Sequence, residues 1–136
     1  MTGVALAAQL TGCTPHRYTS EEAFDHALPL FEAWRQCLAD AAAPSVDSAI
    51  GAPTVAAASL AKCQATEKAM QEALRWGMEF NAANAIVDYQ HDLQRRNLIA
   101  AITEYRRRPR PWTELWDAVA EPPLSLPPPG ERPTPK

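Results

Sequence analysis

Apolar residues recur at helical spacing along most of the chain between residues 19 and 108. In the first half, one stripe contains Leu30, Trp34, Cys37, Leu38 and Ala41, which are separated by three or four residues. This spacing is typical of one face of an amphipathic α-helix. The flanking residues are mostly Ala, Leu, Glu, Gln, Lys and Met, which lose little side-chain freedom in a helix. The pattern predicts an all-α fold.

The helix breakers of the first hundred residues gather in residues 44–53, which contain two prolines, a glycine, two serines and an aspartate. Two helices should therefore meet there as an antiparallel hairpin. The first helix is predicted to begin at Thr19, because Thr19-Ser20-Glu21-Glu22 matches a capping box. For Pro29 two alternatives remain: a kink within this helix, or a separate first turn that ends at Ala27.

The second helix of the hairpin is predicted to be long. Thr54 can cap it, and no proline interrupts the chain from there to Arg108. An unbroken helix of this length would measure about 80 Å at 1.5 Å per residue. Gly77 costs about 1 kcal/mol relative to alanine, so any kink or break is expected at residues 76–84. The first helix can cover the second only to about Phe80.

The part of the second helix beyond Phe80 carries apolar residues that the first helix cannot cover. An exposed apolar patch of this kind usually marks an interface. Either of two elements could cover this patch. The slightly favoured one is the amphipathic segment 109–121, folded back as a short helix. The other is a second copy of the chain, or an unknown protein partner, bound to helix 80–105. The residues assigned to this candidate interface are Ile86, Tyr89, Leu93, Leu98, Ile102, Trp112 and Trp116.

Cys37 and Cys63 lie at equal sequence distances from Ile50, near the centre of the predicted turn. In an antiparallel pair such residues stand level, and packed helix axes leave facing Cα atoms roughly 3.5–5.5 Å apart. A disulfide needs about 4.4–6.8 Å between Cα atoms. The sequence therefore favours a Cys37–Cys63 disulfide over two buried free thiols.

The third cysteine, Cys13, follows Leu10-Thr11-Gly12, and residues 4–8 are apolar. Leu10-Thr11-Gly12-Cys13 resembles the lipobox of bacterial lipoproteins. A signal peptide also has a positively charged segment before its apolar core, and this sequence departs from that pattern because its first Lys or Arg is Arg17. The resemblance implies a signal-peptide remnant in residues 1–12, lipid on Cys13 and a linker over residues 13–18. Because Thr14 is not an aspartate, it also implies the periplasmic side of the outer membrane. The remaining cysteine pair suits such an oxidising compartment.

The charge pattern adds two expectations. A net charge of −3 over 136 residues gives no reason to expect nucleic-acid binding. Arg106, Arg107 and Arg108, with Arg110, stand at a helix C-terminus, where the macrodipole favours cations; contact with anionic lipid head groups is the second interpretation. Residues 122–136 are rich in proline and poor in apolar mass, so a disordered or polyproline II tail is expected.

Candidate chemistry is sparse. Asp88, His91 and Asp92 share one helix face, which is half of a carboxylate-bridged metal pattern, but the second half is missing from the sequence. The sequence therefore predicts no catalytic residue, no metal site, no cofactor and no small-molecule substrate. The favoured hypothesis is a non-enzymatic envelope lipoprotein that acts as a structural or protein-interaction module. The alternatives are a cytoplasmic helical adaptor with free thiols and, less favoured, a metal-dependent enzyme.

Overall fold

The computed structural model describes residues 19–119, and all regular structure within them is helical, which confirms the predicted all-α class. The predicted signal remnant, the linker with Cys13 and the proline-rich tail lie outside the described residues. The elements are α2 (Ser20–Ala42), η1 (Ala43–Ser45), α3 (Ala52–Lys62), α4 (Gln64–Arg75), α5 (Phe80–Arg107) and α6 (Trp112–Ala118).

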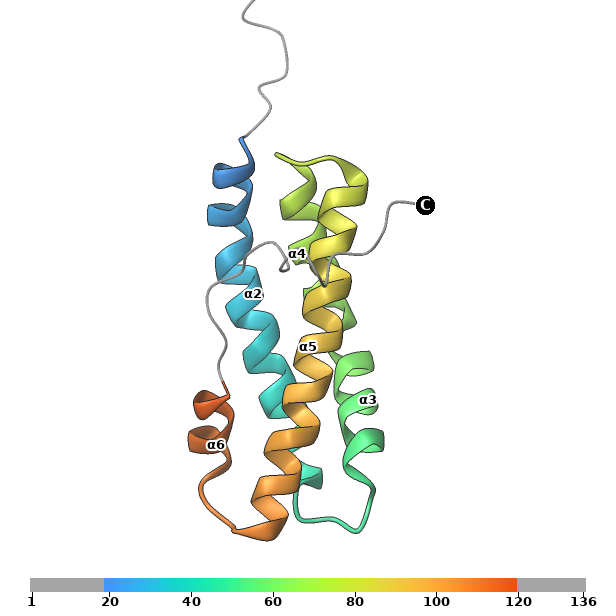
Figure 1. Ribbon diagram of the computed structural model, residues 1–136, viewed down its shortest axis with the longest axis vertical. Coiled ribbons are helices and arrows are strands. Elements are labelled where there is room, and N and C mark those ends of the chain that lie inside the picture. The colour runs from blue at the N-terminus through green and yellow to red at the C-terminus, as the bar shows by residue number, and fades with distance from the viewer. Residues whose placement is uncertain (1–18, 120–136) are drawn as a thin grey trace, which may run out of the picture.

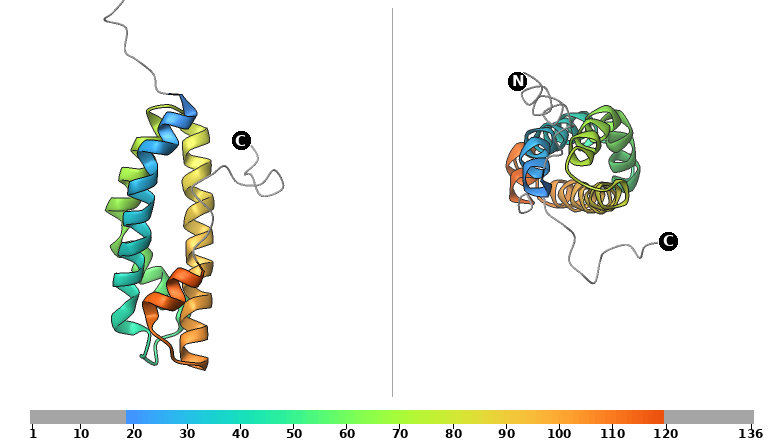
Figure 2. Two further views of the ribbon diagram at one scale, coloured as in Figure 1. Left: turned by 90° about the vertical axis from the view of Figure 1, so that its left-hand side faces the viewer. Right: turned by 90° about the horizontal axis from the view of Figure 1, so that it is seen from above.

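The helices form an antiparallel bundle of three rods (Figures 1 and 2). In the view of Figure 1, α2 descends, α3 and α4 return upward as a second rod, and α5 descends again beside both. The short helix α6 turns back from the lower end of α5 and packs against α2 and α5.

Helix α2 begins where the capping box predicts. The Thr19 hydroxyl accepts a hydrogen bond from the Glu22 amide at 3.1 Å, and the Glu22 carboxylate accepts one from the Thr19 amide at 3.3 Å. The helix then continues through Pro29 to Ala42, so the alternative of a separate first turn is wrong. Pro29 is exposed, and water can therefore satisfy the carbonyl group that its missing amide leaves without a helical partner.

The sequence left open whether the long second helix breaks, and the structure divides it into α3, α4 and α5. The second rod starts at Ala52 rather than after Thr54, and it changes direction at Cys63, whose φ and ψ are −99° and 16°. The chain then breaks at residues 76–79, within the segment where a kink or break was expected, and it reverses direction there. The physical reason is burial, because a straight continuation would leave the apolar stripe of residues 80–105 in water.

The core runs along the whole bundle and includes side chains from all three rods. Burial of one such side chain stabilises the fold by about 1.5–3 kcal/mol. The largest fully buried apolar side chains are Trp34 and Leu38 of α2, Met70 and Leu74 of α4, and Ile86, Leu98 and Ile102 of α5.

This core contains four of the seven residues that the sequence assigned to a candidate interface, and a fifth, Trp112, packs against it. Ile86, Leu98 and Ile102 are 0% exposed. The others are buried or half-buried, namely Trp116, Tyr89, Leu93 and Trp112. The bundle of the same chain therefore covers Ile86, Leu98 and Ile102, which the sequence had left without a cover. A partner or second copy on α5 stays a prediction.

Two indole N–H groups fix α6 to α2. Trp112 Nε1 donates to the Ala39 carbonyl at 2.9 Å, and Trp116 Nε1 donates to the Arg35 carbonyl at 3.2 Å. The Arg35 guanidinium also lies 4.5 Å from the centre of the Trp116 ring. The fold-back of the Trp112 segment, which was the favoured cover, is thus present.

A Trp116→Phe exchange should lower the free energy of unfolding by about 1–3 kcal/mol, because a phenyl ring cannot donate to the Arg35 carbonyl and leaves part of the buried indole space empty. The loss is limited because this carbonyl lies within α2 and can still accept its helical hydrogen bond. Urea denaturation measures the effect, and Trp112→Phe is the matched variant. Unchanged unfolding midpoints in both variants would contradict the assigned role of the two indoles.

Candidate functional site

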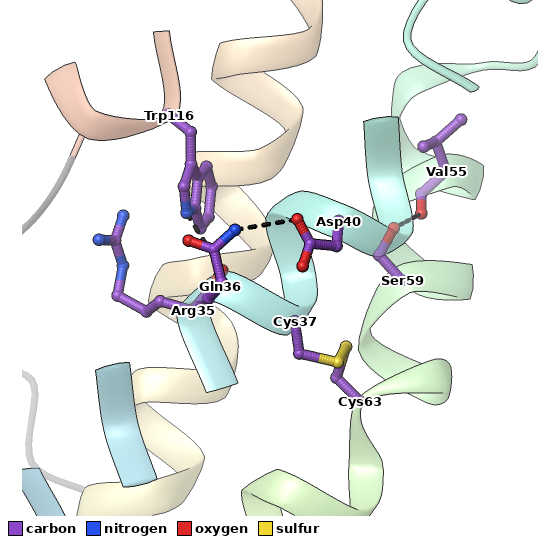
Figure 3. The surroundings of a disulfide bond; sticks show 8 residues. All are labelled: Arg35, Gln36, Cys37, Asp40, Val55, Ser59, Cys63 and Trp116. Atoms are coloured by element: carbon purple, nitrogen blue, oxygen red, sulfur yellow. Dashed lines mark hydrogen bonds between the residues drawn. A yellow bond between two sulfur atoms is a disulfide. The ribbon is translucent and has the colours of Figure 1, made fainter. Parts of the chain in front are cut away.

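Cys37 of α2 and Cys63, at the junction of α3 and α4, form a disulfide (Figure 3). Their Cα atoms are 5.9 Å apart, within the range that a disulfide needs. The pairing predicted from their equal distances to the turn is confirmed. The bond fixes the first rod to the second at the point where the second rod bends.

A groove of about 720 Å³ lies between the α3–α4 rod and α5. Within it, His91 Nδ1 and Glu67 Oε1 are 2.8 Å apart, and the side chains of His91 and Glu67 are 43% and 14% exposed. A carboxylate in this position fixes the orientation and tautomer of an imidazole. Among the described residues that line the groove, none carries a hydroxyl or thiol group that could act as a nucleophile.

Two of the three residues that formed half of a metal-binding pattern on α5, His91 and Asp92, contact other side chains of the protein. His91 faces Glu67, while the Asp92 carboxylate binds Arg95 at 2.8 Å and Arg96 at 3.1 Å. The hydrogen bond from Arg95 holds the pKa of Asp92 below its usual value, assisted by the charge of Arg96 and opposed by partial desolvation. Within residues 19–119, no group of three or more His, Cys, Asp or Glu side chains is placed to hold a metal ion.

The end of α5 is attached to the loop that follows η1. Arg106 Nε donates to the Val46 carbonyl at 3.0 Å, and its Nη2 donates to the Ser45 carbonyl at 3.3 Å. Arg106 therefore stabilises the fold, since it donates hydrogen bonds to these carbonyl groups.

Tyr105, the residue before Arg106, also contacts this loop. A hydrogen bond with the Asp47 carboxylate raises the pKa of Tyr105 above 10.0.

The remaining arginines of the basic run stay at the surface. Arg107 pairs with Glu104 at 2.8 Å, and Arg108 and Arg110 are exposed. The run lies at the lower end of the bundle in Figure 1, whereas α2 begins at the upper end. Any surface that bound these arginines would therefore meet the bundle far from its N-terminal end.

The Tyr105 hydroxyl should titrate above pH 10.0, and an Asp47→Asn exchange should return its midpoint toward that value. Because the folded-state pKa is raised, the stability from this contact is present below the unfolded pKa and is lost as the pH rises through the folded pKa. Phenolate absorbance measures the titration, and Tyr105→Phe identifies its curve among the three tyrosines. A Tyr105 midpoint that does not respond to Asp47→Asn would refute the contact.

Three large apolar side chains of the described residues remain exposed: Ile50 at 49%, Trp76 at 64% and Phe80 at 59%. Ile50 belongs to the loop at the lower end and borders a hollow of about 540 Å³ between α2 and α3. Trp76 and Phe80 belong to the α4–α5 turn at the upper end. Sequence reasoning missed these aromatic residues as a surface, although their positions on either side of Gly77 were the available signal.

The chain matches no protein-family model, no curated protein and no solved structure. None of the helices in residues 19–119 combines the length and apolar character that a membrane span needs.

Proposed function

We propose that this chain is a non-enzymatic lipoprotein of the bacterial cell envelope, anchored through Cys13 on the periplasmic side of the outer membrane. It would act there as a structural or protein-interaction module. The observation that carries the proposal is the Cys37–Cys63 disulfide, because disulfides persist in oxidising compartments and are rare in the cytosol.

Cysteine pairing supports the anchor. The chain has three cysteines, and the disulfide leaves Cys13 over. An unpaired cysteine in an exported protein calls for a role of its own. Here the lipobox-like Leu10-Thr11-Gly12-Cys13 supplies one, since lipid on this thiol would remove the free sulfhydryl group.

The bundle suits a rigid module attached at one end. Helix α5 has 28 residues and is therefore about 42 Å long. Thr19 follows Cys13 by six residues, which can reach at most about 20 Å. A lipid on Cys13 would keep the upper end of the bundle near the bilayer and leave the arginine run at the opposite end. The proposal therefore includes no contact between Arg106, Arg107, Arg108 or Arg110 and the anchoring membrane.

Mass spectrometry of protein purified from native membranes tests the proposal. The expected N-terminal residue is Cys13 carrying diacylglycerol and an acylated amine, with Cys37 and Cys63 oxidised. A Cys13→Ser variant should lose the lipid mass while retaining the disulfide. Soluble protein that retains Met1 and has three alkylatable thiols would refute the proposal and favour the cytoplasmic adaptor.

A further inference from the structure

The turn between α4 and α5 presents two aromatic side chains to solvent. Trp76 is 64% exposed and Phe80 is 59% exposed. The Arg75 guanidinium lies 4.3 Å from the centre of the Phe80 ring, so it covers one face of that ring only. Removing apolar surface from water is favourable, and more than half of each of these two side chains is exposed to it.

These two residues lie at the end of the bundle where α2 begins (Figures 1 and 2). The reason is topological, since α2 and the α3–α4 rod are antiparallel and the end of α4 therefore stands beside the start of α2. A hollow of about 400 Å³ between α2 and α4 is lined by His26, Leu30 and Trp76, among others, which places the indole against the α2 side of this end. The six residues from Cys13 to Thr19 thus join the bundle at its aromatic end.

We propose that Trp76 and Phe80 insert into the head-group region of the membrane to which Cys13 is anchored, so that the bundle stands on its α4–α5 turn. This inference rests on the proposed function, because it takes the lipid on Cys13 as given. Tryptophan favours the bilayer interface, where its ring meets apolar chains and its N–H group meets polar head groups. The lipid anchor holds the two aromatic residues at a high effective concentration near the bilayer. Even a weak affinity of these side chains for the head-group region therefore keeps them inserted.

The charges at this end specify a zwitterionic surface. Glu21 and Glu22 lie in the first turn of α2, and Glu79 precedes Phe80, whereas the Arg75 guanidinium lies over the Phe80 ring. Carboxylates would be repelled by an anionic leaflet. A phosphatidylcholine or phosphatidylethanolamine surface avoids that repulsion and still offers phosphate groups to Arg75.

The test uses the full chain with its disulfide oxidised, in which Cys13 is the one remaining thiol. Phosphatidylcholine vesicles that contain a maleimide lipid couple the chain chemically at Cys13. Lipids brominated near the head group then quench tryptophans that enter the interface. We expect quenching in the coupled wild type and loss of most of the quenched fraction in Trp76→Phe. Trp112→Phe is the matched control, since Trp112 lies at the other end of the bundle, and it should retain the quenching.

Equal quenching in the wild type and in Trp76→Phe, or no quenching in either, would overturn the inference. A blue-shifted Trp76 emission without quenching by brominated lipid, together with crosslinking between chains, would assign this end to a second copy and also overturn it. Stronger quenching on phosphatidylglycerol vesicles would overturn the choice of a zwitterionic surface. Circular dichroism confirms that each variant is folded.

The coupling step separates this inference from the proposed function. Because the maleimide reaction attaches the chain without cellular acylation, absence of quenching counts against the aromatic contact alone. Absence of lipid on Cys13 in native membranes counts against the anchor, and it overturns the inference only because it removes its premise.

Discussion

A Cys37→Ala, Cys63→Ala double exchange is expected to lower the free energy of unfolding by about 3.5 kcal/mol. The two residues are separated by 26 positions, and closing a loop of this length removes that much chain entropy from the unfolded state. For a domain of about 100 residues, the loss corresponds to a fall in melting temperature of about 15–25 °C. Guanidinium denaturation and calorimetry of the oxidised wild type and the variant measure it.

Two controls separate the crosslink from packing. The reduced wild type keeps both sulfur atoms, whereas the alanine variant also leaves space at the buried Cys63 position. Reduced wild type should therefore show most of the loss, with a small further loss in the variant. Cys13→Ser should match the oxidised wild type, because Cys13 takes no part in the bond. A double variant as stable as Cys13→Ser would contradict the role given to the disulfide.

The sequence predicts those parts of the fold that depend on local signals. The capping box at Thr19 starts α2, the breakers at residues 44–53 end the first rod, and the symmetry of Cys37 and Cys63 about Ile50 indicates their pairing. Each of these signals concerns neighbouring residues or one simple antiparallel pair, so it can be interpreted before the whole chain is placed.

The position of α5 as a third rod cannot be predicted from local signals, because it depends on comparing the cost of a turn at Gly77 with the burial that the turn allows. Gly77 disfavours a helix by about 1 kcal/mol, which is compatible with a kink and with a complete reversal. Burial of Ile86, Leu98 and Ile102, at about 1.5–3 kcal/mol each, decides for the reversal. Hydrophobic periodicity shows that these residues share a face, but it does not show which helix covers that face.

Long-range polar contacts were also beyond sequence reasoning. Gln94 is 0% exposed, and its side chain accepts a hydrogen bond from Arg35 Nε at 3.2 Å and donates one to Gln90 at 3.3 Å. Arg106 binds the carbonyl of Val46, 60 positions away. In the sequence these residues resemble ordinary solvated helix positions, and only the packing of α2 against α5 brings them to their partners.

An Ile102→Ala exchange is expected to lower the free energy of unfolding by about 2–5 kcal/mol, whereas Ile50→Ala should change it by less than about 0.5 kcal/mol. Both exchanges remove the same atoms, but Ile102 is 0% exposed in the core and Ile50 is 49% exposed in a loop. Ile50→Ala is therefore the matched control for the intrinsic effect of the exchange. Urea denaturation of the two variants measures the difference.

This comparison tests the chain reversal at Gly77 directly. If α3, α4 and α5 formed one straight rod, the C-terminal half of α5 would extend past α2, and truncating Ile102 would cost as little as truncating Ile50. A large loss at Ile102 alone requires that this half of α5 pack inside the bundle. A small loss at both positions would return the apolar stripe of α5 to the surface and restore it as the interface for a partner.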